Sequence, residues 1–318
     1  MFKSLMKFSL AVLPLAAATL ASAGQLSTDA RSAVPHEVQQ LVVIDYRAMQ
    51  NSRIAMQLRD HLMPPELRQF DDALRKSGMN DNHDVEELAF ALFRTKPNNS
   101  EDLQTVGIAQ GQFSMDEILA NIRKQHQKAT LLRGNKIYPM TRSGMVLCFV
   151  DPSTMVFGQK EAVVKALDAR DGISANIMRN SSMMDAMRSV DSEPLWSILD
   201  NKGTQIVMKS VLGEAGSLTD YDVVRKRLDA SWYSMSFQHG VKFDLTIVTG
   251  DTIAAATISS LLSAAMLVRK MSGSEAEKQA MNATTVSSSA GKLQVRFAAN
   301  DSEFGNLLQS SLFKNVVR

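Results

Sequence analysis

Four methionines gather in one short stretch and could bind a soft metal. The sequence NIMRNSSMMDAM contains Met178, Met183, Met184 and Met187. Thioether sulfur suits Cu(I), so a converging set of these side chains in an exported protein could carry copper. The same spacing also fits a helix capped by Ser181, with methionines one turn apart filling a core. We favour the packing interpretation, keep these four residues as the candidates for a metal site, and predict no cofactor.

An acidic stretch offers oxygen ligands to a hard cation. Residues 80–87, NDNHDVEE, contain five titratable side chains, Asp81, His83, Asp84, Glu86 and Glu87. Ca²⁺ could use such oxygens, but the ligand order of an EF-hand loop and its turn glycine are missing. We therefore interpret the stretch as a solvated turn before a strand.

An acid and a base lie two residues apart in VVIDYRAM, where Asp45 and Arg47 could form a catalytic acid with its partner. On a strand these two side chains point to the same face. An ion pair at a sheet edge, or a contact at the entry to a helix, explains them equally well, and we favour this interpretation.

The motifs of the common enzyme classes are missing. The five histidines have no partner at zinc-ligand spacing, and the sequence contains no nucleophile elbow and no glycine-rich phosphate loop. The single cysteine, Cys148, lies in the apolar run GMVLCFV and is predicted to be a buried small hydrophobe. We predict no catalytic residues, and an enzyme is the less favoured class.

The first 23 residues have the composition of a signal peptide. Lys3 and Lys7 precede an apolar run, residues 8–20, and Ala21-Ser22-Ala23 offers a cleavage site. The run is shorter than the roughly 20 residues that span a bilayer. We expect export to the periplasm or the medium, with cleavage after Ala23.

The charge balance argues against a nucleic-acid partner. The chain has 35 basic and 33 acidic residues, and removal of Lys3 and Lys7 leaves 33 of each. A protein that binds nucleic acid or an anionic membrane normally keeps a basic footprint, and the net charge of this chain would leave none.

One pattern of strand, glycine step and helix occurs twice in the chain. LQTVGIAQGQFSMDEILANIRK begins at Leu103, and LTIVTGDTIAAATISSLLSAAMLVRK begins at Leu245. Each is an alternating strand, a glycine step and an amphipathic helix. The order around each junction predicts an α+β fold of two ferredoxin-like βαββαβ modules with mainly antiparallel sheets, residues 24–190 and 191–318, possibly an internal duplication.

The helix of each copy has its own signature. In the first copy Ser114 and Glu117 form a capping box, and Ile118 and Ile122 belong to an apolar stripe, with Asn121 on the opposite side. In the second copy residues 252–268 carry no charge. We interpret this second run as a helix buried against a sheet, not as a transmembrane segment, because its large apolar residues keep helical phase.

Several segments resemble exported bacterial proteins of unknown function. The segments are VPHEVQQLVVIDYRAM, DVEELAFALF, GIAQGQFSMDEI and MVFGQKEAVVKALD, and they cover most of residues 34–170. This resemblance implies no activity and no catalytic residues. Of the function classes left open, we favour an exported non-catalytic protein that binds a partner protein, an envelope component or an apolar ligand. The alternatives are a hydrolase-type enzyme with a site built from scattered residues, and a carrier of lipid or another apolar molecule.

Overall fold

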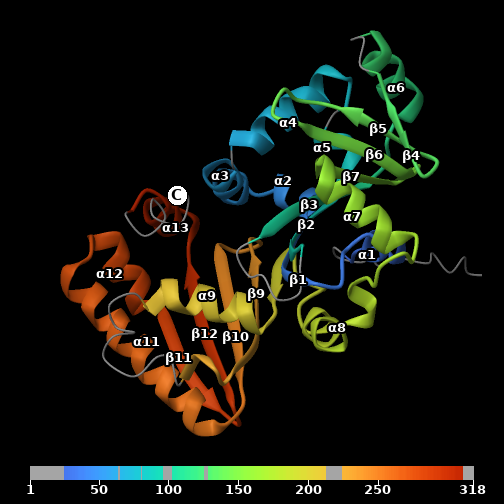
Figure 1. Cartoon of the computed structure of the whole chain (residues 1–318). Helices are drawn as coiled ribbons and strands as arrows, with labels where there is room; N and C mark the ends of the chain where they lie inside the picture. The colour runs from blue at the N-terminus through green and yellow to red at the C-terminus, as the bar shows by residue number, and fades with distance from the viewer. Residues whose placement is uncertain are drawn as a thin grey trace, which may run out of the picture.

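The fold is α+β and is built on one long antiparallel sheet of 12 strands (Figure 1). The computed structural model describes residues 25–63, 65–79, 81–95, 102–124, 128–212 and 224–310. The expected signal peptide, residues 1–23, and its cleavage site lie outside these residues.

The N-terminal half contributes seven strands and most of the short helices. In chain order its elements are α1 (Thr28–Ser32), β1 (Val38–Asp45), α2 (Tyr46–Gln50), α3 (Arg53–Leu62), α4 (Pro65–Lys76), α5 (Asp81–Asp84), β2 (Val85–Arg94), β3 (Leu103–Gly111), α6 (Met115–Lys124), β4 (Thr130–Leu132), β5 (Asn135–Pro139), β6 (Met145–Asp151), β7 (Thr154–Gln159), α7 (Lys160–Arg170), the 3₁₀ helix η1 (Ile177–Arg179) and α8 (Ser181–Arg188).

The C-terminal half contributes five strands and the longest helix. Its elements are β8 (Leu195–Leu199), α9 (Asn201–Leu212), β9 (Leu228–Ser236), β10 (Val241–Thr249), α11 (Thr252–Ser272), α12 (Glu275–Asn282), β11 (Thr284–Ser289), β12 (Lys292–Ala299) and α13 (Asp301–Leu308).

The two halves arrange their strands in the same way. The sheet order is β11-β12-β10-β9-β8-β1-β2-β3-β7-β6-β5-β4. Read outward from the centre, each half has its first, second and third strands side by side, then its last hairpin in reversed order. The N-terminal half adds only the hairpin β4–β5. The two similar sequences both fall at the step from the third strand into a helix, β3 to α6 and β10 to α11. This equivalence is what an internal duplication would produce.

The strand order corrects one part of the predicted fold. In the split βαβ arrangement of ferredoxin-like folds, another strand separates the two strands that a helix connects. Here β1 and β2 are direct neighbours, although α2 to α5 connect them, and β8 and β9 are neighbours across α9. Local sequence patterns predict where strands and helices lie. They do not predict which strands pair, because pairing depends on contacts between residues that are far apart in the sequence.

One continuous sheet joins the halves. Strand β1 pairs with β8 in antiparallel register, with Leu41 opposite Ile198 and Val43 opposite Trp196. Strand β8 is buried along its whole length, as expected for a strand that is covered on both faces, whereas four of the eight residues of β1 are only partly buried. The predicted boundary after residue 190 therefore lies where the backbone enters a strand at the centre of the shared sheet.

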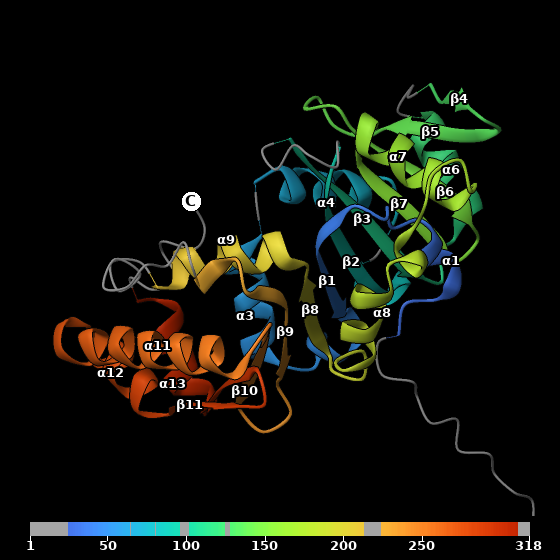
Figure 2. The same cartoon turned by 60° about the horizontal axis from the view of Figure 1, so that its bottom comes forward.

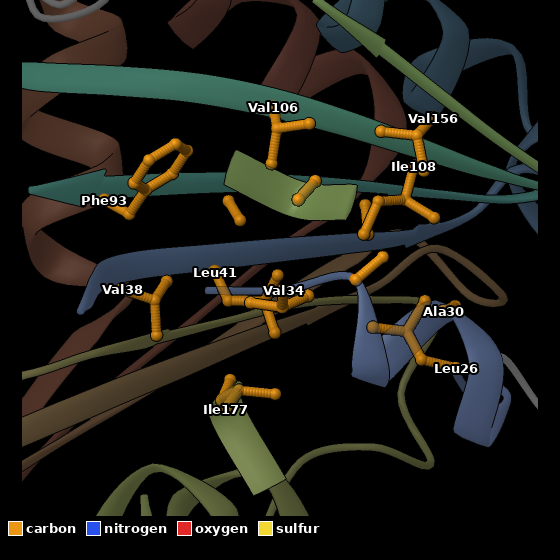
Figure 3. Close-up of a cluster of buried hydrophobic side chains, with 14 of the residues drawn as sticks. Leu26, Ala30, Val34, Val38, Leu41, Phe93, Val106, Ile108, Val156 and Ile177 are labelled. Carbon is orange, nitrogen blue, oxygen red and sulfur yellow. The ribbon is translucent and has the colours of Figure 1, made fainter. Parts of the chain in front are cut away.

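The largest core lies over this junction. It packs side chains of β1, β2, β3 and β7 against α1, α7, α8 and η1. Figure 3 shows part of it, with Val106, Ile108 and Val156 on the sheet above Leu26 and Ala30 near α1. Leu26 and Ala30 are 3% and 0% exposed, so the segment that follows the expected cleavage site belongs to the core.

Helices cover the C-terminal half of the sheet on one face. Alternate residues of β10 and β12, such as Ile247 and Leu293, face α9, α11, α12, α13 and α3. On the opposite face Lys242, Lys292 and Arg296 are exposed. Strand β12 therefore has one face in the core and one face exposed to solvent.

Several elements are not indicated by the sequence pattern. Strand β11 reads TTVSSS and forms the sheet edge beside β12, where its mostly exposed Ser and Thr side chains give no apolar alternation. Residues 130–139 form the hairpin β4–β5 around Gly134. The helices α12 and α13 are short, and each begins at a capping box, at Ser274 and Asn300 respectively.

Candidate functional site

The methionine cluster is divided between core and surface. Met183 and Met187 are 1% and 2% exposed and belong to the core that contains Trp196. Met184 packs against that core from a partly buried position, whereas Met178 on η1 is 40% exposed. The helix cap is Asn180, not Ser181, because its side chain accepts a hydrogen bond from the Met183 amide. This arrangement agrees with the packing interpretation.

The acidic stretch is less solvated than its composition suggests. It forms the short helix α5 and the start of β2, and the His83 side chain is 81% exposed. Asp84 and Glu87, however, are only 8% and 9% exposed. The interpretation as a solvated turn is wrong for these two residues, because β2 alternates and Glu87 falls on its inward face.

Asp45 makes the predicted helix-entry contact. Its Oδ1 atom accepts a hydrogen bond of 2.8 Å from the Ala48 amide and caps α2. Arg47 pairs with Glu86 at 2.6 Å, not with Asp45, because the chain turns into α2 between them. The C-terminal half has the same kind of helix cap. Asp200 follows β8, and its Oδ1 atom accepts a hydrogen bond of 2.8 Å from the Gly203 amide at the start of α9.

Glu87 is the buried carboxyl group with the clearest shift in its pKa. It lies opposite Asp45 across the β1–β2 ladder and opposite Gln110 on β3. Its buried Oε2 atom makes no hydrogen bond in the described structure. Burial raises its pKa to about 7, and the negative charges of Asp45 and Glu86 act in the same direction. A substrate could reach Glu87 only by displacing packed side chains, so we do not assign it a catalytic role.

Replacing Glu87 by Gln should remove a pH dependence of stability. The folded-state pKa of about 7 lies above the ordinary value of 4.5, so the folded chain holds this proton where the unfolded chain has lost it. The stabilisation is therefore complete below pH 4.5 and disappears as the pH rises through 7. We expect Glu87→Gln to raise the free energy of unfolding by about 2 kcal/mol at pH 8, less than the full shift implies, because solvent screens part of it.

Urea unfolding of both proteins between pH 5 and pH 8 measures this effect. The matched control is Glu86→Gln, which removes the neighbouring carboxylate, whose side chain is 36% exposed and pairs with Arg47. Its stability difference from the parent should change with pH much less than that of Glu87→Gln, because the Glu86 charge is the smallest of the three causes that raise the pKa of Glu87. A Glu87→Gln difference that does not grow with pH would show that Glu87 is ionised throughout.

Cys148 is buried as predicted. Its side chain is 0% exposed, and burial raises the pKa of the thiol to about 11. The residue is therefore a neutral thiol at physiological pH, which removes it from the candidates for a nucleophile.

The outward side of α11 is the largest unexplained surface. Six exposed residues follow one another at intervals of three and four along it, and we call them the α11 outer face: Ile253, Ala256, Ser260, Ser263, Leu267 and Met271. Ile253, Leu267 and Met271 are 75%, 58% and 78% exposed. Figures 1 and 2 show α11 at the periphery of the C-terminal half, away from the N-terminal half.

The other side of α11 is packed. Ile258, Leu261 and Leu262 are 0%, 4% and 6% exposed and contact the sheet core of the C-terminal half. The predicted packing against a sheet is confirmed for this side. The burial is limited to this side, because only 28% of the most apolar window of α11 is buried. By length and composition α11 is also long and apolar enough to cross a membrane.

The hydroxyl groups on α11 are satisfied within the helix. Ser260 donates to the Ala256 carbonyl at 3.1 Å, and Ser263 donates to the Ser259 carbonyl at 2.9 Å. Thr257 makes the same bond to the Ile253 carbonyl at 2.9 Å. Such bonds remove the donor hydrogens from the surface, so moving this face out of water costs less than its serine content suggests.

The neighbouring helix extends the apolar surface. Ile206 and Val207 on α9 are 51% and 41% exposed, and α9 contacts α11. Six of the ten large hydrophobic side chains that are exposed in the described part of the chain therefore lie on these two helices. Clustering of this kind marks a binding surface more often than isolated exposed side chains do.

Basic residues lie at both ends of α11. Arg225, Lys226 and Arg227 are exposed just before β9, and the Gly250 amide next to the helix donates to the Arg227 carbonyl at 2.8 Å. Arg227 pairs with Asp251 at 2.5 Å. Hydrogen bonding from the Ala254 amide, with this pairing, lowers the pKa of Asp251, which caps the helix as an anion. Arg269 and Lys270 stand at the other end.

Comparisons with known proteins give a fold likeness only. No protein-family model matches the chain, and no curated protein matches it. The solved structure of crystal form I of TP0453 aligns with a TM-score of 0.49 and 10% identity, over 91% of this chain and 97% of that one. Crystal form III of the same protein aligns with a TM-score of 0.49 and 8% identity, over 87% and 96%.

Sequence reasoning missed the α11 outer face for a simple reason. A run without charges reads as buried, and helical phase alone does not tell how many sides of a helix find a partner. The sequence does contain one signal for this face. From Ile253 to Met271, the positions at intervals of three or four residues carry only apolar and small hydroxyl side chains.

Proposed function

We propose that this chain is an exported, non-catalytic protein that binds an apolar component of the cell envelope through α9 and α11. The α11 outer face is the observation that carries the proposal. A helix of 21 residues whose solvent side has no charge between Asp251 and Arg269 is poorly suited to remain in water.

The alternatives have less support. A carrier of apolar molecules needs a cavity of roughly 300 Å³ or more. Among the described residues, the hollow between α12, β12 and α13 has a volume of only about 50 Å³ and is open to solvent. A hydrolase needs converging groups that a substrate can reach. In the described residues the acid with the clearest shift in its pKa, Glu87, is enclosed by the sheet.

Fractionation of cells that produce the protein tests the proposal. The parent protein should sediment with the envelope after lysis, and the double variant Leu267→Glu/Met271→Glu should appear mainly in the soluble fraction. The matched control places the same two changes on exposed apolar residues of the N-terminal half, Leu131→Glu/Ile173→Glu. It should fractionate like the parent.

Two outcomes would contradict the proposal. The parent could remain soluble, or both double variants could lose envelope binding equally. The second result would mean that any added negative charge displaces the protein, so α9 and α11 would not be the binding surface.

A further inference from the structure

We infer that the component bound by α11 is the surface of an anionic lipid bilayer, and that the helix lies in the plane of that surface. This inference rests on the proposed function and names the partner of the same site. Three properties of α11 carry it: its chemistry, its attachment to the sheet and its charged ends.

The chemistry of the α11 outer face suits hydrocarbon better than a folded partner. The face offers Ile253, Leu267 and Met271 separated by alanine and serine, with no aromatic or arginine anchor of the kind that dominates protein interfaces. Its serine hydroxyls are bonded to the carbonyls of the preceding turn, as Ser260 is to Ala256. A partner protein would therefore find few hydrogen-bonding groups to recognise on this face.

The attachment to the sheet sets the orientation. A helix of 21 residues is about 31 Å long, enough to cross the hydrocarbon layer. Crossing, however, would require Ile258, Leu261 and Leu262 to leave the core that they now fill. With that side packed, the helix can bury only its outer face, to the depth of about 5–10 Å that is typical of interfacial helices.

The charged ends favour anionic headgroups. Arg225 and Lys226 lie near the start of α11, and Arg269 and Lys270 lie in its last turns, whereas Asp251 is paired with Arg227. Glu275 lies beyond the C-terminal end, in the first turn of α12. A basic group at each end of an apolar face allows the long side chains to reach headgroup phosphates while the face enters the acyl layer.

Vesicle sedimentation tests this inference with the purified chain. The lipids are phosphatidylethanolamine with phosphatidylglycerol, compared with phosphatidylcholine alone, at low and high salt. We expect sedimentation with the anionic vesicles that weakens with salt. The variant Leu267→Glu/Met271→Glu should lose at least about tenfold in partitioning, because two apolar side chains no longer leave water. The control Leu131→Glu/Ile173→Glu should match the parent.

Depth measurement tests the orientation. In the variant Ser263→Trp, which places the probe at the middle of the α11 outer face, lipids with a quencher near the headgroup should reduce the added fluorescence more than lipids with a quencher near the bilayer centre. Stronger quenching from the centre would overturn the in-plane orientation.

Other outcomes separate this inference from the proposed function. Envelope binding in cells without vesicle binding would overturn the lipid inference and leave the proposed function standing, with a protein partner. Equal binding to phosphatidylcholine would overturn the preference for anionic lipid. A dimer that Leu267→Glu/Met271→Glu dissociates, seen by sedimentation equilibrium, would show that a second copy covers the face.

Discussion

Replacing Arg94 by Ala is expected to lower the free energy of unfolding by about 3–5 kcal/mol. Arg94 ends β2, and its guanidinium reaches Asp200 at 2.8 Å and Gln39 at 3.2 Å, across the junction between the halves. The two charged side chains are only 9% and 14% exposed. Removal of the guanidinium would leave a buried carboxylate without its counter-charge.

A matched set of variants separates the lost pair from the lost arginine. Arg47→Ala removes an arginine whose ion pair with Glu86 is solvated, with side chains 63% and 36% exposed, and should cost less than about 1 kcal/mol. Arg94→Leu/Asp200→Asn removes both charges and keeps an acceptor for the α9 cap, so it should recover most of the loss. Chemical denaturation measures all of these variants. Equal losses for Arg94→Ala and Arg47→Ala would contradict the role of the buried pair.

Replacing Ile118 by Asp should cost about 4 kcal/mol. Ile118 on α6 is 0% exposed and packs in the core that contains Phe70, Phe113 and Phe157. An ionised carboxyl group at this position would lose its hydration without gaining a partner. The control Ile118→Val keeps the site apolar and should cost only about 1 kcal/mol. Thermal unfolding distinguishes the two, and equal melting temperatures would mean that α6 does not bury this side.

The side of α6 opposite its apolar stripe also makes a tertiary contact. The sequence places Asn121 away from the apolar stripe, where a change to Asp would be neutral. In the structure its Nδ2 atom donates to the Ser77 carbonyl at 3.1 Å, in the turn that ends α4. Asn121→Asp would replace this donor with a carboxylate oxygen, so two acceptors would face each other. We therefore expect the change to lower the free energy of unfolding by about 1–2 kcal/mol.

The sequence by itself determined the local features of this protein. Alternation located β3 and the part of β10 that begins at Leu245, and helical phase located α6, because these periods arise from the backbone geometry of single elements. The entry contact at Asp45 was predicted for the same reason, since a cap involves residues three positions apart. The repeated step from strand to helix at residues 103–124 and 245–270 also depended on local signals, and the shared strand order supports it.

Only the tertiary structure decided which surfaces meet. Strand pairing set β1 beside β2 and β8, which brought Arg94 to Asp200 over a separation in sequence that no local pattern spans. The same pairing enclosed Glu87, which the sequence had placed in a solvated turn. The exposure of α11 has the same origin. Its inner side fills the sheet core, and no element of the described chain covers Leu267 and Met271. A run without charges therefore forms an exposed apolar face.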